Sequence, residues 1–523
     1  MSARICGLFA AFLFVSILGQ AQSPPNVSQV LLYSATTTAN NGGGSSPAFP
    51  GIFSETKQTT DLAALGTFLN GGACDASCAA VANTIGTAGN YTVNQSFASL
   101  IGALNGSIAT ALSIVPLASP ASGVIFRKDP QTGLILGESS TLGPIFTERA
   151  ETIGKGKFYI GFSNQDFHFT QYNGTSLNAL SVFYNGGQST ALSAGSTPLT
   201  TAPAIARVGM DVRLAQDITF LTYGVTDRFD ISVGLPVVHS SVAARTYGGV
   251  IYAGNGFGNP TCWCANTFTA GTPTLLEPII GQASYGKTGF GDLLVRAKGT
   301  VLRTAHTVLG IGADVRFPTG DVDNYLGVGT TSVKPFAALS FYTKPFSNGV
   351  VLSPHLDAGW QFAGQSILAG QVQGTALSSA GIIGAPFTFS KADLPDVFSW
   401  DGGAEIALGN RNTIVADILG NQIGWIHGIQ NTTTLTLNNL SLPTGPNGTG
   451  PSPGSPPPTP AVVPSVTGLI TAGRVSYGQY NASLGYKARL AGNLIAYFDA
   501  LIRIDNNGLT ARFTPMAGVG YSF

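Results

Sequence analysis

The sequence predicts a mainly β protein, an antiparallel transmembrane β-barrel of about 12 strands with a small helical N-terminal domain. The first observation behind this prediction is the end of the chain. From residue 511 to residue 523 every second residue is apolar, and the residues between are mostly small or polar. This period of two indicates a strand with one apolar face. Aromatic residues at its end, Tyr521 and Phe523, are typical of the girdle of a membrane barrel.

The second observation is the composition. Only 10% of the 523 residues are charged, the net charge is +0, and the mean hydropathy is +0.25. Soluble domains usually contain about 25% charged residues. The sequence has no series of apolar runs of about 20 residues, which membrane helices would need. Apolar residues spread by alternation therefore favour a barrel, and the lack of excess Lys and Arg argues against a nucleic-acid partner.

The third observation is the spacing of the strands. From residue 156 onward, strand patterns are joined alternately by tight turns, such as 225–228, and by mostly long loops. Outer-membrane barrels have short periplasmic turns and longer external loops. The strands are expected near 158–169, with a bulge before Phe167, and near 207–214, 229–235, 292–301, 309–317, 333–343, 355–362, 398–408, 413–425, 480–489, 498–504 and 509–523.

The N-terminus predicts export. Arg4, the apolar run 5–18 and the small residues before position 22 indicate a signal peptide over 1–21, removed on the way to a Gram-negative outer membrane. Residues 22–155 are predicted to be a periplasmic or plug domain, and residues 156–523 the barrel. Within the N-terminal domain we expect a linker at 22–50, helices near 61–69 and 96–115, and a hairpin over 123–138. The uncharged run 96–115 could also span a bilayer, but its Gly, Ser, Thr and Asn residues favour a helix packed on protein.

Four cysteines remain after removal of the signal peptide, in two close pairs, Cys74 with Cys78 and Cys262 with Cys264. Local disulfides are the favoured reading in an oxidising periplasm. A metal site is the alternative, but no His lies near either pair in the sequence, so no metal and no cofactor are predicted. The Pro-rich run 451–458 could be a domain linker. Strand patterns on both sides of it favour a surface loop.

Charged residues occupy one face of the predicted strands and cannot face lipid, so they are expected to line the lumen. They are Arg207, Asp211, Arg213, Asp230, Asp292, Arg296, Lys298, Asp314, Arg316, Asp357, Glu405, Asp499 and Arg503. Their mixed signs predict cross-strand ion pairs, either in an open pore or in a plugged barrel. Trp360, Trp400, Tyr521 and Phe523 are predicted membrane-girdle residues.

Two enzyme-like patterns are weak. Ser353, His355 and Asp357 share one strand face, but that face points to the lumen, away from lipid substrates. Gly281 and Gly286-Lys287-Thr288 match a phosphate loop, but a strand follows where that motif needs a helix. No enzyme activity is predicted. A soluble β-sandwich is also disfavoured, because so many strands carry an apolar face.

Three segments carry a family resemblance: 223–238, 289–293 and 314–321, the last reading Asp-Val-Arg-Phe-Pro-Thr-Gly-Asp. Together they resemble the meta-pathway phenol-degradation family of outer-membrane proteins. The resemblance implies a channel that passes small hydrophobic or aromatic compounds. A structural or surface-displaying barrel with a closed lumen is the alternative. The C-terminal Phe523 with Tyr521 also resembles the signal by which the barrel-assembly machinery recognises its clients. The expected partners are membrane lipid, that machinery and a small solute, with the protein a monomer.

Overall fold

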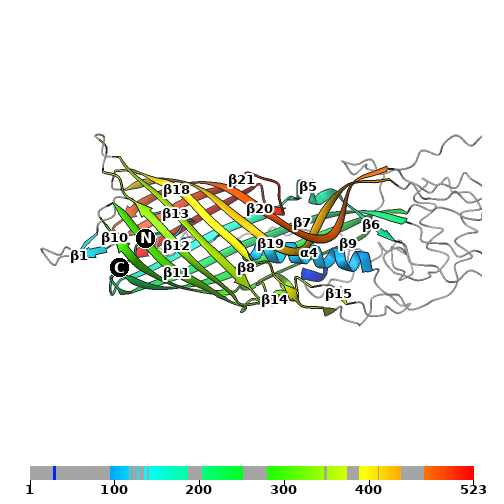
Figure 1. Cartoon of the computed structure of the whole chain (residues 1–523), viewed down its shortest axis with the longest axis horizontal. Helices are drawn as coiled ribbons and strands as arrows, with labels where there is room; N and C mark the ends of the chain where they lie inside the picture. Colours follow the sequence, from blue (N-terminus) through cyan, green and yellow to red (C-terminus); the bar gives the residue numbers. More distant parts are fainter. Residues whose placement is uncertain are drawn as a thin grey trace, which may run out of the picture.

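The computed structural model describes residues 27–30, 95–116, 119, 126–128, 135–137, 141–185, 203–250, 279–304, 306–344, 346, 350–370, 372–373, 388–409, 411–436 and 465–523. These residues form a long barrel, with helix α4 (Gln95–Ser113) at one end and the short hairpin of β1 (Phe126–Lys128) and β2 (Ile135–Gly137) at the other (Figure 1). The predicted hairpin over 123–138 and the helix near 96–115 are both present. The predicted signal peptide, the helix near 61–69, both cysteine pairs and the Pro-rich loop lie outside the described residues.

Twelve described strands close the wall, as the sequence predicted. Each pairs antiparallel with the next, and β23 pairs with β3 through residues 516–522 and 159–165. In wall order they are β3 (Phe158–Phe169), β7 (Pro203–Thr226), β8 (Phe229–Val250), β10 (Leu293–Arg303), β11 (Thr307–Phe317), β12 (Ser332–Phe341), β13 (Val351–Ala363), β18 (Val397–Leu408), β19 (Asn412–Thr436), β20 (Ser465–Ala491), β21 (Leu494–Arg503) and β23 (Phe513–Ser522).

Two further strands extend the wall beyond this ring. β6 (Leu180–Asn185) continues the line of β3 beside β7 and meets β20 in parallel, and β9 (Ile279–Phe290) continues the line of β10 beside β8. The phosphate-loop match lies in β9, where Thr288 pairs with His239 of β8, so the structure contradicts a phosphate loop there. Among the described residues, no helix is long and apolar enough to cross a membrane.

Small elements occupy the breaks between the wall strands. β4 (Gln171–Tyr172), β5 (Thr175–Ser176) and β22 (Leu509–Thr510) form one small sheet. β14 (Gln365–Ser366) pairs with β17 (Ala392–Asp393), and β15 (Val372–Gln373) pairs with β16 (Thr388–Phe389). The 3-10 turns are η1 (Val27–Gln29), η2 (Leu177–Ala179) and η3 (Val322–Asn324).

The outer face of the barrel carries a belt of exposed apolar side chains, among them Ile160, Phe162, Leu221, Ile231, Val233, Ile311, Leu484 and Ile502. A monomeric soluble protein rarely exposes so large an apolar surface, whereas a barrel in lipid requires it. Aromatic residues mark both edges of the belt. The rings of Phe158, Tyr223, Tyr521 and Phe523 contact one another at the end where β3 begins and β23 finishes, and Trp360, Phe362 and Phe398 cluster at the opposite edge.

Along the long strands, the apolar side chains change from the outer face of the wall to the inner face. In β3, Phe158, Ile160 and Phe162 point outward, but further along the same strand Asp166 and His168 point outward and Phe167 inward. The pairing of β3 with β7 is continuous over 158–169, so the predicted bulge is wrong. What changes is the surrounding medium: the strand leaves lipid and enters water, so the apolar side chains move to the inner face.

The part of the barrel beyond the belt therefore has a core like that of a soluble protein. Inward side chains of β7, among them Val208, Met210 and Val212, belong to the same hydrophobic cluster as Ile101 and Ile108 of α4. The helix packs on protein inside the wall, as the sequence predicted, but its residues 101–113 are all buried, so it has no solvent-exposed polar face and the predicted amphipathic character is not seen.

Val233 and Ala243 lie on the outer face of β8, in the belt and beyond it respectively, and they test this exchange of polarity. We expect Val233→Arg to lower the free energy of unfolding by about 2–4 kcal/mol, because it places a charge in lipid. Ala243→Arg faces water opposite Asp211 and should change it by no more than about 0.5 kcal/mol. Urea unfolding in lipid vesicles measures both, and equal losses would contradict the assignment of the belt.

Candidate functional site

The lumen is occupied by a segment of the chain's own N-terminal part. Residues 141–154, here called the inner segment, are all buried and form neither helix nor strand. A buried backbone must still find hydrogen-bond partners, and in the absence of a sheet ladder these come from side chains of the wall. Five backbone N–H groups donate to wall oxygens: Leu142 to Thr413 Oγ1 at 3.1 Å, Gly143 to Glu405 Oε2 at 2.9 Å, Glu148 to Asp357 Oδ2 at 2.6 Å, Ala150 to Ser340 Oγ at 3.2 Å and Ile153 to Asp230 Oδ2 at 2.9 Å.

Wall donors satisfy the carbonyl groups of the inner segment in the same way. Lys487 Nζ donates to Pro144 O at 2.5 Å, Lys298 Nζ to Arg149 O at 2.8 Å, and Thr300 Oγ1 to Ala150 O at 2.9 Å. The wall also makes room: a Cβ at Gly310 would lie 2.7 Å from Ala150 O, so the absence of a side chain permits this close approach.

A buried cluster of ions fixes the middle of the inner segment. Glu148 Oε1 accepts from Lys298 Nζ at 2.6 Å, and its other oxygen is paired with Arg296. Arg296 also binds Asp314 through two parallel hydrogen bonds of 2.6 and 2.7 Å. Burial alone would raise the pKa of the Glu148 carboxyl, but the charges of Lys298 and Arg296 outweigh it and hold that pKa below its usual range.

A second buried group lies where β13, β18 and β19 meet. His355 Nε2 lies 2.7 Å from Asp417 Oδ1, and its Nδ1 lies 3.7 Å from Glu405. Ser353 and Asp357 face the interior with His355, but the hydroxyl of Ser353 has no partner among the described residues. The three side chains do not form a catalytic relay, because a relay needs the base within hydrogen-bond reach of the nucleophile.

Helix α4 lies at the mouth of the lumen opposite the hairpin of β1 and β2. Its Asn105 accepts a hydrogen bond of 2.6 Å from the Tyr325 hydroxyl, and Ser107 donates to the Tyr172 hydroxyl at 3.2 Å. Arg316 of β11 donates to the carbonyl of Leu112 at 3.1 Å, near the C-terminal end of the helix.

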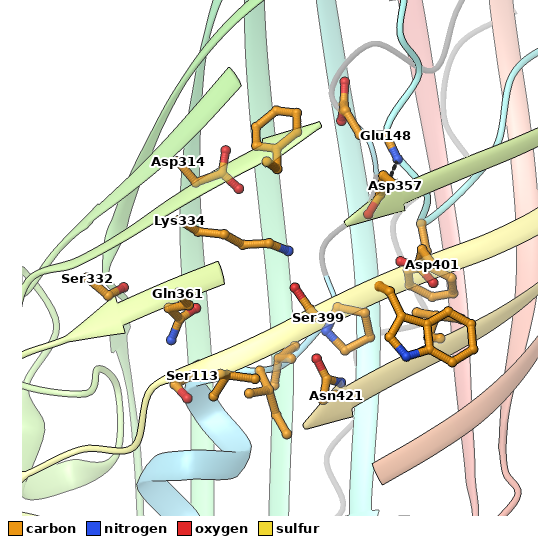
Figure 2. A pocket seen from close by; sticks show the side chains of 18 of the residues that line it. Ser113, Glu148, Asp314, Ser332, Lys334, Asp357, Gln361, Ser399, Asp401 and Asn421 are labelled. Carbon is orange, nitrogen blue, oxygen red and sulfur yellow. Dashed lines mark hydrogen bonds between the residues drawn. The ribbon is translucent and has the colours of Figure 1, made fainter. Parts of the chain in front are cut away.

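Two cavities lie beside α4. The larger, here called the polar cavity, has a volume of about 110 Å³ and lies between the end of α4, the inner segment and strands β10 to β19. Figure 2 shows the Lys334 side chain reaching into it, with Asp357 and Asp401 across from it. The smaller, here called the apolar cavity, has a volume of about 30 Å³ and is lined mainly by apolar side chains, including Phe220, Val238 and Leu326, together with the charged Asp292 and Arg316. Leu294 and Arg316 line both, so the two cavities adjoin.

Most predicted lumen residues lie on the inner face: Asp230, Asp292, Arg296, Lys298, Asp314, Arg316, Asp357, Glu405, Asp499 and Arg503. The prediction is wrong for Asp211 and Arg213, which are about half exposed on the outer face of β7 beside His168. They lie beyond the apolar belt, where the outer face meets water. The side chain of Arg207 lies outside the described part of the chain.

The predicted girdle residues all lie on the outer face. Trp360, Tyr521 and Phe523 are at the belt edges, and the ring of Trp400 packs against Tyr480 with centroids 6.4 Å apart. In the described part of the chain, no group of His, Cys, Asp and Glu has the arrangement of a metal site.

Sequence reasoning missed several residues of the lumen. Glu148 and Arg149 precede the first strand, and only their concentration of charge in a sparsely charged chain could have drawn attention to them. Lys334, Asp417 and Lys487 alternate with apolar neighbours in predicted strands, so these could have been included from the pattern alone.

A family model described as "Putative MetA-pathway of phenol degradation" matches residues 184–378, which confirms the resemblance seen in the sequence. No curated protein matches the chain.

The chain can be aligned structurally with several solved barrels. An outer membrane channel from Pseudomonas putida F1 is 11% identical, covering 72% of this chain and 98% of that one, with a TM-score of 0.37. A Pseudomonas aeruginosa FadL homologue is 13% identical, covering 78% and 97%, with a TM-score of 0.28. The Ralstonia pickettii toluene transporter is 12% identical, covering 71% and 89%, with a TM-score of 0.26. These TM-scores are low, so the barrel architecture is established from the strand pairings and not from these structural alignments.

Removing the charge of Glu148 tests how the inner segment is held. Glu148→Gln leaves Lys298, which is 2% exposed, without its counter-charge. We expect a loss of about 3–5 kcal/mol in the free energy of unfolding. Hydrogen exchange should rise in residues 141–154. The matched control is Asp211→Asn, which breaks an exposed ion pair and should cost no more than about 1 kcal/mol. Equal effects of the two variants would show that the buried cluster does not hold the segment.

Proposed function

We propose that the protein is an outer-membrane channel of a Gram-negative bacterium that takes up small hydrophobic or aromatic compounds by passive diffusion. The family match and the belted, closed barrel support this proposal. The observation that carries it is the manner in which the lumen is closed. The inner segment, which blocks the lumen, is attached by side-chain contacts and is not part of the sheet, while the polar cavity remains beside it and adjoins the apolar cavity.

A segment held in this way can move without breaking the wall. The wall strands share continuous ladders of backbone hydrogen bonds, and opening them would expose backbone to lipid. The inner segment has no ladder, so its release costs a limited set of hydrogen bonds and ion pairs. Local openings of this kind have free energies well below that of global unfolding. A solute would then pass from the mouth that holds α4, through the cavities, to the end of the barrel where β3 begins and β23 finishes.

The alternative is a structural or surface-displaying barrel with a permanently closed lumen. The buried ion cluster around Glu148 favours this alternative, because breaking a buried pair is costly. The two proposals differ in one respect only, which is whether the inner segment moves.

The remaining features of the proposal follow from the sequence. Residues 1–21 act as a cleaved signal peptide, residues 22–155 as an N-terminal domain that serves as the plug, and residues 156–523 as the barrel. The protein acts as a monomer in outer-membrane lipid. The barrel-assembly machinery recognises its C-terminal strand, and the protein needs neither a cofactor nor a catalytic residue.

A disulfide between the inner segment and the wall tests the proposal. Ala150 N donates to Ser340 Oγ at 3.2 Å, so these two residues are in direct contact, and a pair of cysteines at these positions is the choice for a cross-link. We expect oxidised Ala150→Cys/Ser340→Cys to reduce uptake of toluene and benzyl alcohol by vesicles to the level of protein-free vesicles. Reduction should restore uptake, because it frees the segment.

The two single-cysteine variants are the controls, since they carry the chain's own cysteines through the same treatment. Uptake that is unchanged by the closed disulfide would contradict a moving inner segment. Uptake that is absent from every variant, including the reduced and wild-type proteins, would favour the structural barrel.

A further inference from the structure

The chain that follows α4 continues into the lumen and lies beside the inner segment. Residues 113–116 line the polar cavity together with Phe146 and Glu148 of the inner segment. Figure 2 shows Ser113 at the end of the helix and Glu148 on another side of this cavity. Val115 also belongs to the same hydrophobic cluster as Phe146. The residues described after the helix, 114–116 and 119, are here called the helix extension.

Ser119 joins the helix extension to the inner segment at two points. Its backbone N–H donates to Ile145 O at 2.7 Å, and its Oγ donates to Glu148 Oε2 at 3.0 Å. Ser119 is only 3% exposed, and among the described residues both of these bonds go to the inner segment and neither to the wall. The second bond reaches the residue that fixes the inner segment, because Glu148 is held by Lys298 and Arg296.

Wall side chains hold this end of α4 in the same manner as they hold the inner segment. Gln165 Nε2 of β3 donates to the carbonyl of Pro116 at 3.0 Å, and Arg316 of β11 donates to the carbonyl of Leu112 at 3.1 Å. The described residues of the helix extension belong to no strand, so no ladder joins them to the wall. The helix and the inner segment can therefore both leave the wall without opening the sheet.

Separate movement of the two parts would be unfavourable. If the inner segment left its place alone, the N–H and the hydroxyl of Ser119 would lose their acceptors while the residue stayed buried. A buried donor without a partner is costly, because its lost hydration is not replaced. Movement of both parts together keeps the two bonds of Ser119 intact. The geometry therefore favours joint movement of α4 and the inner segment.

We propose that Ser119 couples α4 to the inner segment, so that displacement of the helix at its mouth of the barrel moves the segment in the lumen. This inference rests on the proposed function and deepens it, because it names the device that opens the lumen. Ile101 and Ile108 hold α4 by apolar packing, and the hydroxyls of Tyr325 and Tyr172 hold it by hydrogen bonds. A hydrophobic solute at this mouth competes for the apolar packing, and Ser119 passes the displacement on to the inner segment.

Hydrogen exchange of the full-length protein in lipid nanodiscs measures this coupling. Tyr325→Phe removes the hydroxyl that donates to Asn105 and so loosens α4. We expect the exchange protection of residues 141–154 to fall about two- to tenfold, the usual effect of losing one hydrogen bond. Ser119→Ala removes the bond to Glu148. In that background, Tyr325→Phe should cause no further fall in the protection of residues 141–154.

Tyr172→Phe is a second variant that loosens α4, because it removes the hydroxyl that accepts from Ser107. It should give the same result, which keeps the test informative if Tyr325→Phe does not fold. The matched control is Tyr486→Phe, which removes an exposed hydroxyl that lies 2.7 Å from Asn412 Oδ1 on the outer face of the wall. This control should leave the protection of residues 141–154 unchanged.

Coupling between two parts of a protein is reciprocal, which gives an independent measurement. The oxidised Ala150→Cys/Ser340→Cys protein has its inner segment fixed to the wall. Hydrogen exchange in residues 101–113 of α4 should therefore be slower in the oxidised than in the reduced protein. Adding Ser119→Ala should remove this difference.

Two results would overturn the inference. One is an equal fall in the protection of residues 141–154 with and without the Ser119 hydroxyl, and the other is exchange in α4 that does not respond to fixing the inner segment. Hydrogen exchange does not depend on transport. Uptake without this coupling would reject the role of Ser119 and leave the channel intact. Coupling without uptake would support the role of Ser119 and reject the channel.

Discussion

The structure depends on one constraint: in lipid, every backbone N–H and C=O must find a partner within the protein. The wall meets it by closing β23 onto β3, so that no strand edge remains in the belt. The inner segment meets it differently, because it lies inside the wall without a ladder of its own. Carboxylates such as Glu405 and Asp357 accept its N–H groups, and Lys298 and Lys487 donate to its carbonyls. The charges of the lumen are thus structural partners of the inner segment.

The same strands work in two media. Within the belt, apolar side chains face lipid and polar ones face the lumen. Beyond it, Val208, Met210 and Val212 face inward and pack with α4, while Asp211 and Arg213 face water. The pairing register of β3 with β7 is unbroken through this change. The helix therefore lies in an apolar core like that of a soluble protein. This core is directly next to the polar lumen that the belt surrounds.

The sequence was sufficient for the parts of the structure that depend on alternation. All twelve wall strands and the helix at 96–115 could be predicted from it, because each has a period of its own, and the hairpin before the barrel could be predicted from its Asp-Pro-Gln-Thr-Gly turn at 129–133. The inward positions of Arg296, Lys298 and Asp314 follow from the same alternation, since a charge opposite lipid is too costly. Asp211 and Arg213 show the limit of this argument. Alternation shows which residues share a face of a strand, but not whether that face contacts lipid, water or the lumen. The inner segment has no period, so neither its path nor the role of Glu148 could be read from the sequence.

The path of the chain through the barrel has a consequence for assembly. Helix α4 lies at one mouth and the hairpin of β1 and β2 at the other, and the inner segment then returns into the lumen and leads directly into β3 (Figure 1). The polypeptide is thus threaded through its own ring. Two backbone hydrogen bonds of 2.9 Å between Phe158 and Phe523 close that ring where β3 begins and β23 ends. If the ring closed first, the N-terminal part of the chain would have to pass through it afterwards, whereas closing it after that part is in place requires no such passage. The threaded path thus favours late pairing of β3 with β23 during folding.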